Sequence, residues 1–213
     1  MADSLFEAKK FLEAAEAYEQ LLENERSYSP AMLLKLAFVH EASGNFTRAL
    51  YVLHLYYSKH PSRKTLKKME ALAQQHGLQG FDYSDYDFFA TQARKYHKRI
   101  LEVLMMASVM AVTLALVYRL RGRRTSFQAF AGMLLLLVAV FYYLNFVSFG
   151  RFGIVQRHKL ALMSGPSAGS SLLRTLPKGN RLAILDQQDI WVKVQLTDTV
   201  AYVRREHLWL LPE

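Results

Sequence analysis

The sequence contains no cysteine. Disulfide bonds, thiolate zinc sites and a cysteine nucleophile are therefore excluded, although the cellular compartment stays open. The opening residues, MADSLFEAKK, also lack the apolar core that a cleavable signal peptide requires. No segment has the pattern of a basic recognition helix or of a basic strand with interleaved stacking aromatics. The net charge of +9 therefore does not indicate nucleic acid as a partner.

Motifs for catalysis, phosphate binding and metal binding are missing as well. The seven histidines form no HExxH pair, and the turn GPSAGSS lacks the spaced second glycine and the lysine of a phosphate-binding loop. The aspartates of GFDYSDYDFF lack the glycine and distal glutamate of a calcium loop, so this segment is interpreted as a solvated linker. No serine, histidine and carboxylate combination stands out. We predict no catalytic, cofactor-binding or metal-binding residues and a non-enzymatic protein.

Residues 1–77 carry apolar side chains at helical spacing, interrupted by turn-forming residues at Ser29-Pro30, Ser43-Gly44-Asn45 and His60-Pro61. These interruptions predict short antiparallel helices. A period near 34 residues is typical of tetratricopeptide repeats, although two copies are few and a generic amphipathic hairpin is the alternative. The residues that recur 35 positions later are Phe11, Ala14, Tyr18 and Leu21, which become Phe46, Ala49, Leu53 and Tyr56.

The second copy of the repeat fits best. Small Ala37 and Ala49 would let its two helices approach closely, while larger residues fill the groove between them. A further helix over residues 63–75 would cap the array. The first copy lacks most of its opening helix, which suggests that a segment precedes it.

Two apolar runs lie after the repeats, over residues 101–118 and 129–149. A helix needs about 20 apolar residues to cross a bilayer, and both runs are close to that length. The segment between them, RLRGRRTSFQ, is short enough only for a tight connection. We therefore predict a two-helix transmembrane hairpin, with a buried soluble hairpin as the alternative.

After Gly150 the apolar residues alternate with period two, which predicts five short strands in a small barrel. The segment LALMSGPSAGSSLLRTLPKGNRLAILDQQDIWVKVQLTDTVAYVRREHLWLL resembles a bacterial SH3-type domain. Gly165-Pro166 matches the opening turn of that family, and the central strand contains Trp191. Tyr202 stands where the family usually has tryptophan, and Val200-Ala201 replaces the usual Lys/Thr-Gly, so the resemblance carries the fold but not a conserved ligand groove.

The order of these parts resembles the E-type proteins of the Bacteroides aerotolerance (Bat) operons. The opening ADSLFEAKKFLEAAEAYEQLL is similar to the mature N-terminus that signal-peptide cleavage leaves in that family, so Met1 is interpreted as an added or reannotated start. The resemblance implies both soluble domains on the periplasmic side of the bacterial cytoplasmic membrane, membrane-protein partners from the same operon, and a role in aerotolerance or oxidative-stress survival. Counting Lys and Arg around the spans favours the cytoplasm instead. We follow the resemblance for orientation.

The expected fold class is a multidomain membrane protein with an all-α tetratricopeptide-like repeat domain, a two-helix transmembrane hairpin and a C-terminal small all-β SH3-like barrel. The expected boundaries are 1–77 for the repeats, 78–99 for an aromatic and basic juxtamembrane linker, 100–119 for the first span, 120–127 for a basic loop, 128–149 for the second span and 154–213 for the barrel.

Two surfaces are predicted to bind partners. The concave face of the repeats would bind protein partners through Lys35, Phe38, Val39 and Glu41. The barrel face around Trp191 and Tyr202 would bind peptidoglycan peptides as the alternative function, although Trp191 is expected more in the core than at a contact. The remaining partner is the lipid bilayer.

Overall fold

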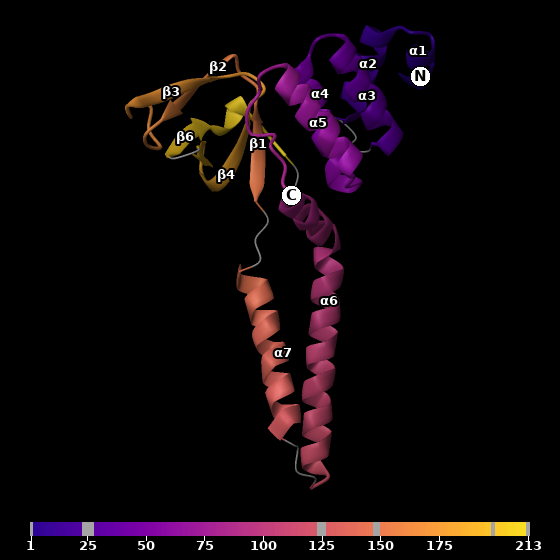
Figure 1. Ribbon diagram of the computed structural model, residues 1–213, viewed down its shortest axis with the longest axis vertical. Coiled ribbons are helices and arrows are strands. Elements are labelled where there is room, and N and C mark those ends of the chain that lie inside the picture. Colours follow the sequence, from indigo (N-terminus) through magenta and orange to yellow (C-terminus); the bar gives the residue numbers. More distant parts are fainter. Residues whose placement is uncertain (1, 23–27, 123–126, 147–149, 197–198, 212–213) are drawn as a thin grey trace. The chain divides into compact units, whose positions relative to one another are not determined.

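The computed structural model divides into two compact units, one made of Met1–Thr91 with Gly150–Glu213 and one made of Gln92–Phe149. The first unit therefore joins the N-terminal helices to the C-terminal sheet (Figure 1). The residues that the structure describes are 2–22, 28–122, 127–146, 150–196 and 199–211.

The described residues of the N-terminal part of the first unit form five helices, and the three predicted turns precede α3, α4 and α5. Ser29 caps α3 by accepting a hydrogen bond from Met32 N, with proline at the first helical position. Gly44 adopts φ 74° in the turn before α4, a left-handed conformation that favours glycine. The helices are α1 (Ala2–Glu7), α2 (Phe11–Gln20), α3 (Pro30–Ala42), α4 (Phe46–Lys59) and α5 (Arg63–Gln75). The prediction of a helix over 63–75 is confirmed.

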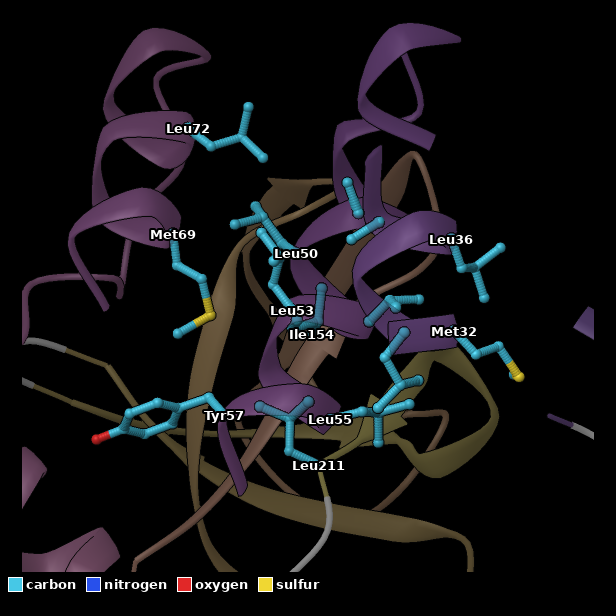
Figure 2. Close-up of a cluster of buried hydrophobic side chains, with 14 of the residues drawn as sticks. Met32, Leu36, Leu50, Leu53, Leu55, Tyr57, Met69, Leu72, Ile154 and Leu211 are labelled. Atoms are coloured by element: carbon cyan, nitrogen blue, oxygen red, sulfur yellow. The ribbon is translucent and has the colours of Figure 1, made fainter. Parts of the chain in front are cut away.

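Small residues lie where α3 packs on α4, as predicted. Ala37 and Ala49 are 3% and 0% exposed. Around them the larger core side chains of α3, α4 and α5 interdigitate, including Leu36, Leu50 and Met69 (Figure 2). The helical part therefore has the close helix pairs that the repeat pattern required.

The C-terminal part of the first unit is an antiparallel sheet with the strand order β3-β2-β6-β5-β4-β1-β7. Burial alternates along two of its strands, over 191–195 and 200–204, where Val192, Val194 and Val203 are fully buried. The strands are β1 (Arg151–Val155), β2 (Lys159–Met163), β3 (Leu172–Pro177), β4 (Arg181–Gln188), β5 (Trp191–Gln195), β6 (Val200–Arg204) and β7 (Leu208–Leu210), with the short 3-10 helix η2 (Arg205–His207) before β7.

The described residues contain seven strands, so the expectation of five was wrong. Strand β1 buries three consecutive residues, and β3 exposes five of its six. Neither strand alternates with period two, which is why the hydrophobic pattern did not reveal them.

The helices and the sheet share one core. Ile154 of β1 and Leu211 belong to the buried cluster of the helices (Figure 2). Gln79 N donates a hydrogen bond to Asn180 Oδ1 at 2.7 Å, and Arg181 N donates to Gln79 O at 3.0 Å. We call this contact between residues 79–83 and residues 180–181 the junction. The expectation of two separate soluble domains is therefore replaced by one unit with a junction.

The junction leaves no room for a side chain at residue 80. A Cβ on Gly80 would lie 2.2 Å from Arg181 O, and the backbone of Gly80 has φ 86°. Phe81 is 2% exposed and belongs to the core cluster of the helices, so the expectation of a solvated linker is corrected at this residue. Most of the segment that follows it is exposed or half-buried, with Tyr86 77% and Phe89 61% exposed.

The Arg181 side chain also stabilises the junction. Its Cζ lies 3.6 Å from the centroid of the Phe152 ring and 4.9 Å from that of Tyr83. Its Nη1 donates to Gly80 O at 2.9 Å. A buried guanidinium between two aromatic faces gains cation–π attraction that is little screened by water.

The second unit is built from α7 (Phe127–Phe146) and most of α6 (Asp85–Leu120). Helix α6 starts well before the expected span. Within the described residues it is the one helix long and apolar enough to cross a membrane, while residues 130–145 form a shorter apolar stretch. Of the expected basic loop, residues 123–126 lie outside the described residues.

These two helices bury little of their apolar surface. In the most apolar 18-residue window of α6 only 6% of the residues are buried. The two helices contact each other at one end, where His97 Nδ1 lies 3.0 Å from Tyr143 Oη and the two rings stack. A buried hairpin of a soluble protein would bury these residues, so their low burial disfavours that alternative.

Candidate functional site

Three phenylalanines from three helices form a cluster that we call the aromatic surface: Phe6, Phe11 and Phe38. Their ring centroids lie 5.6, 6.0 and 6.2 Å apart, in edge-to-face geometry. Phe38 is 52% exposed, and Leu34, one turn earlier on α3, is 44% exposed. Large apolar side chains at i and i+4 share one helix face. The aromatic surface therefore continues along α3 as an exposed apolar strip.

The four helix residues that were predicted to bind partners do not share one surface in the structure. Phe38 belongs to the aromatic surface, and Lys35 lies beside it with Nζ 5.3 Å from the Phe6 centroid. Glu41 instead forms an ion pair with Lys68 of α5. Val39 is completely buried and cannot contact a partner, so its prediction as a contact was wrong. The reason is that α3 packs on both α2 and α4, and Val39 lies on a buried face of the helix.

A carboxylate beside the aromatic surface holds Lys35 in place. Lys35 Nζ donates to Asp3 Oδ1 at 2.8 Å, and Tyr18 Oη donates to the same oxygen. These two hydrogen bonds lower the pKa of Asp3. Burial, together with Asp3, raises the pKa of Tyr18. The charge of Lys35 is thus partly balanced within the protein, and the exposed feature that remains is apolar.

A second polar cluster links the helices to the sheet. Arg48 Nε donates to Glu19 Oε1 at 2.7 Å, and His40 Nε2 lies 2.8 Å from the same oxygen. Burial alone would raise the pKa of Glu19, but the hydrogen bonds from Arg48 and His40 outweigh it and lower the pKa to about 2. Arg48 Cζ also lies 4.8 Å from the Trp209 ring centroid. The cluster therefore positions an arginine of α4 against β7.

Next to this cluster lies a groove of about 660 Å³ between α4 and the sheet. Tyr51 of α4 lines one wall and packs against Trp209, with 5.5 Å between ring centroids. Arg205 and the exposed Ile190 also line it. We call this the α4–sheet groove. Its lining combines two aromatic rings with two arginines and two carboxylates, Asp189 and Glu206, and Arg204 forms an ion pair with Glu206.

The two predicted sheet residues lie outside the α4–sheet groove. Trp191 and Tyr202 are half-buried on the outward face, because the residues next to them in sequence point inward. The expectation that Trp191 belongs to the core was therefore wrong. Its ring centroid lies 5.9 Å from Cζ of Arg204, which also lines the groove, while Tyr202 pairs across the strands with Lys193 and Met163.

Sequence reasoning missed the residues that shape the α4–sheet groove. Tyr51 lies off the repeat positions that were assigned to helix packing, and Trp209 is the second tryptophan of the chain. Either residue could have been marked as an aromatic without an assigned role. The contact between them could not have been predicted, because α4 and β7 are about 150 residues apart and no local pattern joins them.

Residues 159–208 match the Bacterial SH3 domain family. The match covers β2 to β6 and ends at the first residue of β7, so the SH3 part of the predicted fold is confirmed. No curated protein matches the chain.

Proposed function

We propose, taking the SH3 match as the premise, that this protein is a non-enzymatic, membrane-anchored adaptor. The observation that carries the proposal is the continuous helix α6, which begins in the first unit and runs into an apolar segment that is only 6% buried. An apolar helix exposed on nearly all sides is stable in hydrocarbon and not in water. The protein would thus hold its helical and SH3-like parts at a membrane surface.

The junction supports a chain that crosses the membrane twice. Gln79 precedes α6 and Asn180 follows α7, yet the two residues are hydrogen bonded. Two segments in contact lie on the same side of a membrane, so the chain between them crosses an even number of times. With α6 as one crossing, α7 is the candidate for the second, because its 20 residues span about 30 Å.

The aromatic surface is the proposed site for protein partners, presented by tetratricopeptide-like repeats. Exposed clusters of large apolar side chains commonly mark binding sites, and aromatic residues dominate the energetics of such sites. By resemblance to the Bat E-type proteins, the partners would be membrane proteins of the same operon. The same resemblance places both soluble parts in the periplasm and links the complex to aerotolerance.

Partner binding can be tested with the full chain in detergent and tagged membrane proteins of the same operon. Replacing Phe38 with serine should weaken binding about 30-fold, since an aromatic anchor contributes about 2 kcal/mol. Leu172→Ser is the matched control, because Leu172 is similarly exposed (57%) but lies on β3. Equal affinity of the Phe38 variant and the control would refute the helical binding site.

Orientation can be tested by protease accessibility in right-side-out and inverted vesicles. The proposal expects the helical and SH3-like parts to be cleaved together from the outside. Cleavage of both only in inverted vesicles would place them in the cytoplasm and end the envelope interpretation. Cleavage of the two parts from opposite sides would exclude a two-pass chain.

A second candidate function is binding of peptidoglycan peptides, which the SH3 match and the α4–sheet groove favour. Arg204 of the groove is paired with Glu206, so the exposed Arg205 is the proposed contact for a carboxylate of such peptides. Full-length protein in detergent should sediment with purified peptidoglycan, and Arg205→Gln should reduce the sedimented fraction severalfold. Lys64→Gln removes the same charge from exposed α5 as a control. If the unsubstituted protein stays in the supernatant, this second function is wrong.

A further inference from the structure

A groove of about 530 Å³ lies between α6 and α7, inside the second unit. Small side chains create it: Ala111 and Ala115 are one turn apart on α6, and Gly132 lies on α7. A Cβ on Gly132 would meet no heavy atom within 4 Å. The rest of the lining is almost entirely apolar, with Met133 and Leu136 partly buried in it. We call this the interhelix groove.

One charged side chain lines the interhelix groove, and it lies at the end where α6 stops. Arg119 occupies the last turn of α6, and exposed Arg121 follows two residues later. The sequence contains no Asp or Glu between Glu102 and Asp186. Glu102 is 17 residues before Arg119, about 25 Å along the helix. The second unit therefore has no carboxylate that could neutralise these arginines.

We propose that the interhelix groove binds an acyl chain of an anionic phospholipid whose phosphate contacts Arg119 and Arg121. The inference rests on the proposed membrane hairpin, because only in hydrocarbon does such a groove face lipid. Guanidinium groups bind phosphate oxygens with two parallel hydrogen bonds, and basic pockets between transmembrane helices are known to select anionic lipids. The N-terminal amides of α7, which begins at Phe127, add a favourable field for an anion.

A second copy of the chain is the main competing occupant. It would fill the apolar groove but would bring a second set of unneutralised arginines to the same end. Like charges at close range repel, most strongly where water is excluded. The charge pattern therefore favours an anionic lipid over self-association.

The test uses the full chain in micelles, with native mass spectrometry to count bound phosphatidylglycerol or phosphatidylcholine of identical acyl chains. Phosphatidylglycerol should bind more tightly, and Arg119→Gln with Arg121→Gln should weaken it about 30-fold, at roughly fivefold for each charge. Lys98→Gln with Arg99→Gln is the matched control, since it removes two exposed charges from the other end of the apolar run. This control should change binding less than twofold.

A second pair of variants tests the groove rather than the charges. Gly132→Leu should fill the interhelix groove and weaken phosphatidylglycerol binding about tenfold. Ala139→Leu places the same side chain at an exposed position of α7 and should leave binding unchanged. Inorganic phosphate should not compete at millimolar concentration, because it lacks the acyl chain.

Three results would overturn the inference: equal binding of the two lipids, equal losses in the two charge variants, or a dimer that Gly132→Leu dissociates. Alkaline carbonate extraction separates this failure from failure of the proposed function. If carbonate releases the chain from membranes, the anchored adaptor itself is wrong. If the chain stays in the membrane but shows no lipid preference, only the lipid site is wrong.

Discussion

The two units of this protein place the same kinds of side chain in opposite environments. In the first unit, Leu50 and Met69 are completely buried. In the second unit, Met106 is 65% exposed and Leu135 is 72% exposed. The first unit hides its apolar surface by packing helices and strands on one another. The second hides almost none, so its stability in the proposed function depends on the solvent around it rather than on its own contacts.

The largest difference between the two units should come from replacing one leucine with alanine in each of them. Leu50→Ala should lower the free energy of unfolding of the first unit by about 2 to 5 kcal/mol, because it opens a cavity in a packed core. Leu134→Ala should change the stability of the second unit by less than about 1 kcal/mol, since Leu134 is 54% exposed. Chemical unfolding followed by circular dichroism measures both. Similar losses would mean that the second unit is also held by internal packing.

An added arginine should distinguish an exposed residue that faces lipid from an exposed residue that faces water. Val109→Arg should disfavour membrane insertion by about 3 kcal/mol, the cost of an arginine in a bilayer. Leu172→Arg, at a similarly exposed site on β3, should change stability by less than about 0.5 kcal/mol. The fraction of chain retained after alkaline carbonate extraction measures the first effect. Full retention of Val109→Arg would argue that this face of α6 meets water.

Acid should weaken the first unit selectively through Glu19. Its pKa is about 2 in the folded protein against 4.5 ordinarily. A lowered folded pKa contributes stability above pH 4.5 that is lost as the pH falls toward 2. Because solvent screens this partly exposed pair, the loss should be on the order of 1 to 2 kcal/mol. Both tryptophans belong to the first unit, so urea unfolding followed by tryptophan fluorescence reports on it alone.

The control for this acid effect is Glu13→Gln, which alters an exposed carboxylate on the same helix. Glu19→Gln should flatten the dependence of stability on pH between 2 and 4.5, whereas Glu13→Gln should preserve it. The helicity of the second unit should stay constant over the same range, because Glu102 is its one carboxylate. Identical pH profiles for the two variants would remove Glu19 as the cause.

The smallest effect should come from the junction. Asn180 is 2% exposed and accepts from Gln79 N while donating to Pro177 O at 2.9 Å. Asn180→Ala leaves Gln79 N unsatisfied and should cost about 1 to 2 kcal/mol. Hydrogen exchange at the Gln79 amide should accelerate about tenfold or more. Gln195→Ala, at an exposed end of β5, should leave that amide protected. An unprotected Gln79 amide in the unsubstituted protein would contradict the junction.

Local signals in the sequence predicted local structure well. The cap at Ser29, the turn at Gly44 and the helix over 63–75 were recoverable because each depends on residues within one turn of itself. The SH3-like strands were recoverable where they alternate, as in β5 and β6. The same rule failed for β1 and β3, whose burial does not follow period two.

Features built from distant residues were beyond that reasoning. Phe81 is buried in a cluster that includes Ile154 and Leu211, more than 70 residues later, and the burial of Val39 depends on helices packing on two sides of α3. The residues that line the α4–sheet groove come from α4 and from strands more than 100 residues later. Of the predicted contacts, Phe38 and Lys35 lie together at the aromatic surface, where residues on one helix were enough to suggest them.

The junction also determines when, during synthesis, the first unit can complete its fold. Arg181 and Gly80 are hydrogen bonded across 101 residues, and Leu211 completes the core of helices that begin at residue 2. The core of the helices over residues 2–75 therefore cannot be completed until residue 211 has been synthesised. Closing so long a segment costs conformational entropy, and the contact of His97 with Tyr143 shortens it by joining α6 to α7. In the proposed topology, insertion of the hairpin into the membrane brings together the two chain segments that form the core, one before α6 and one after α7.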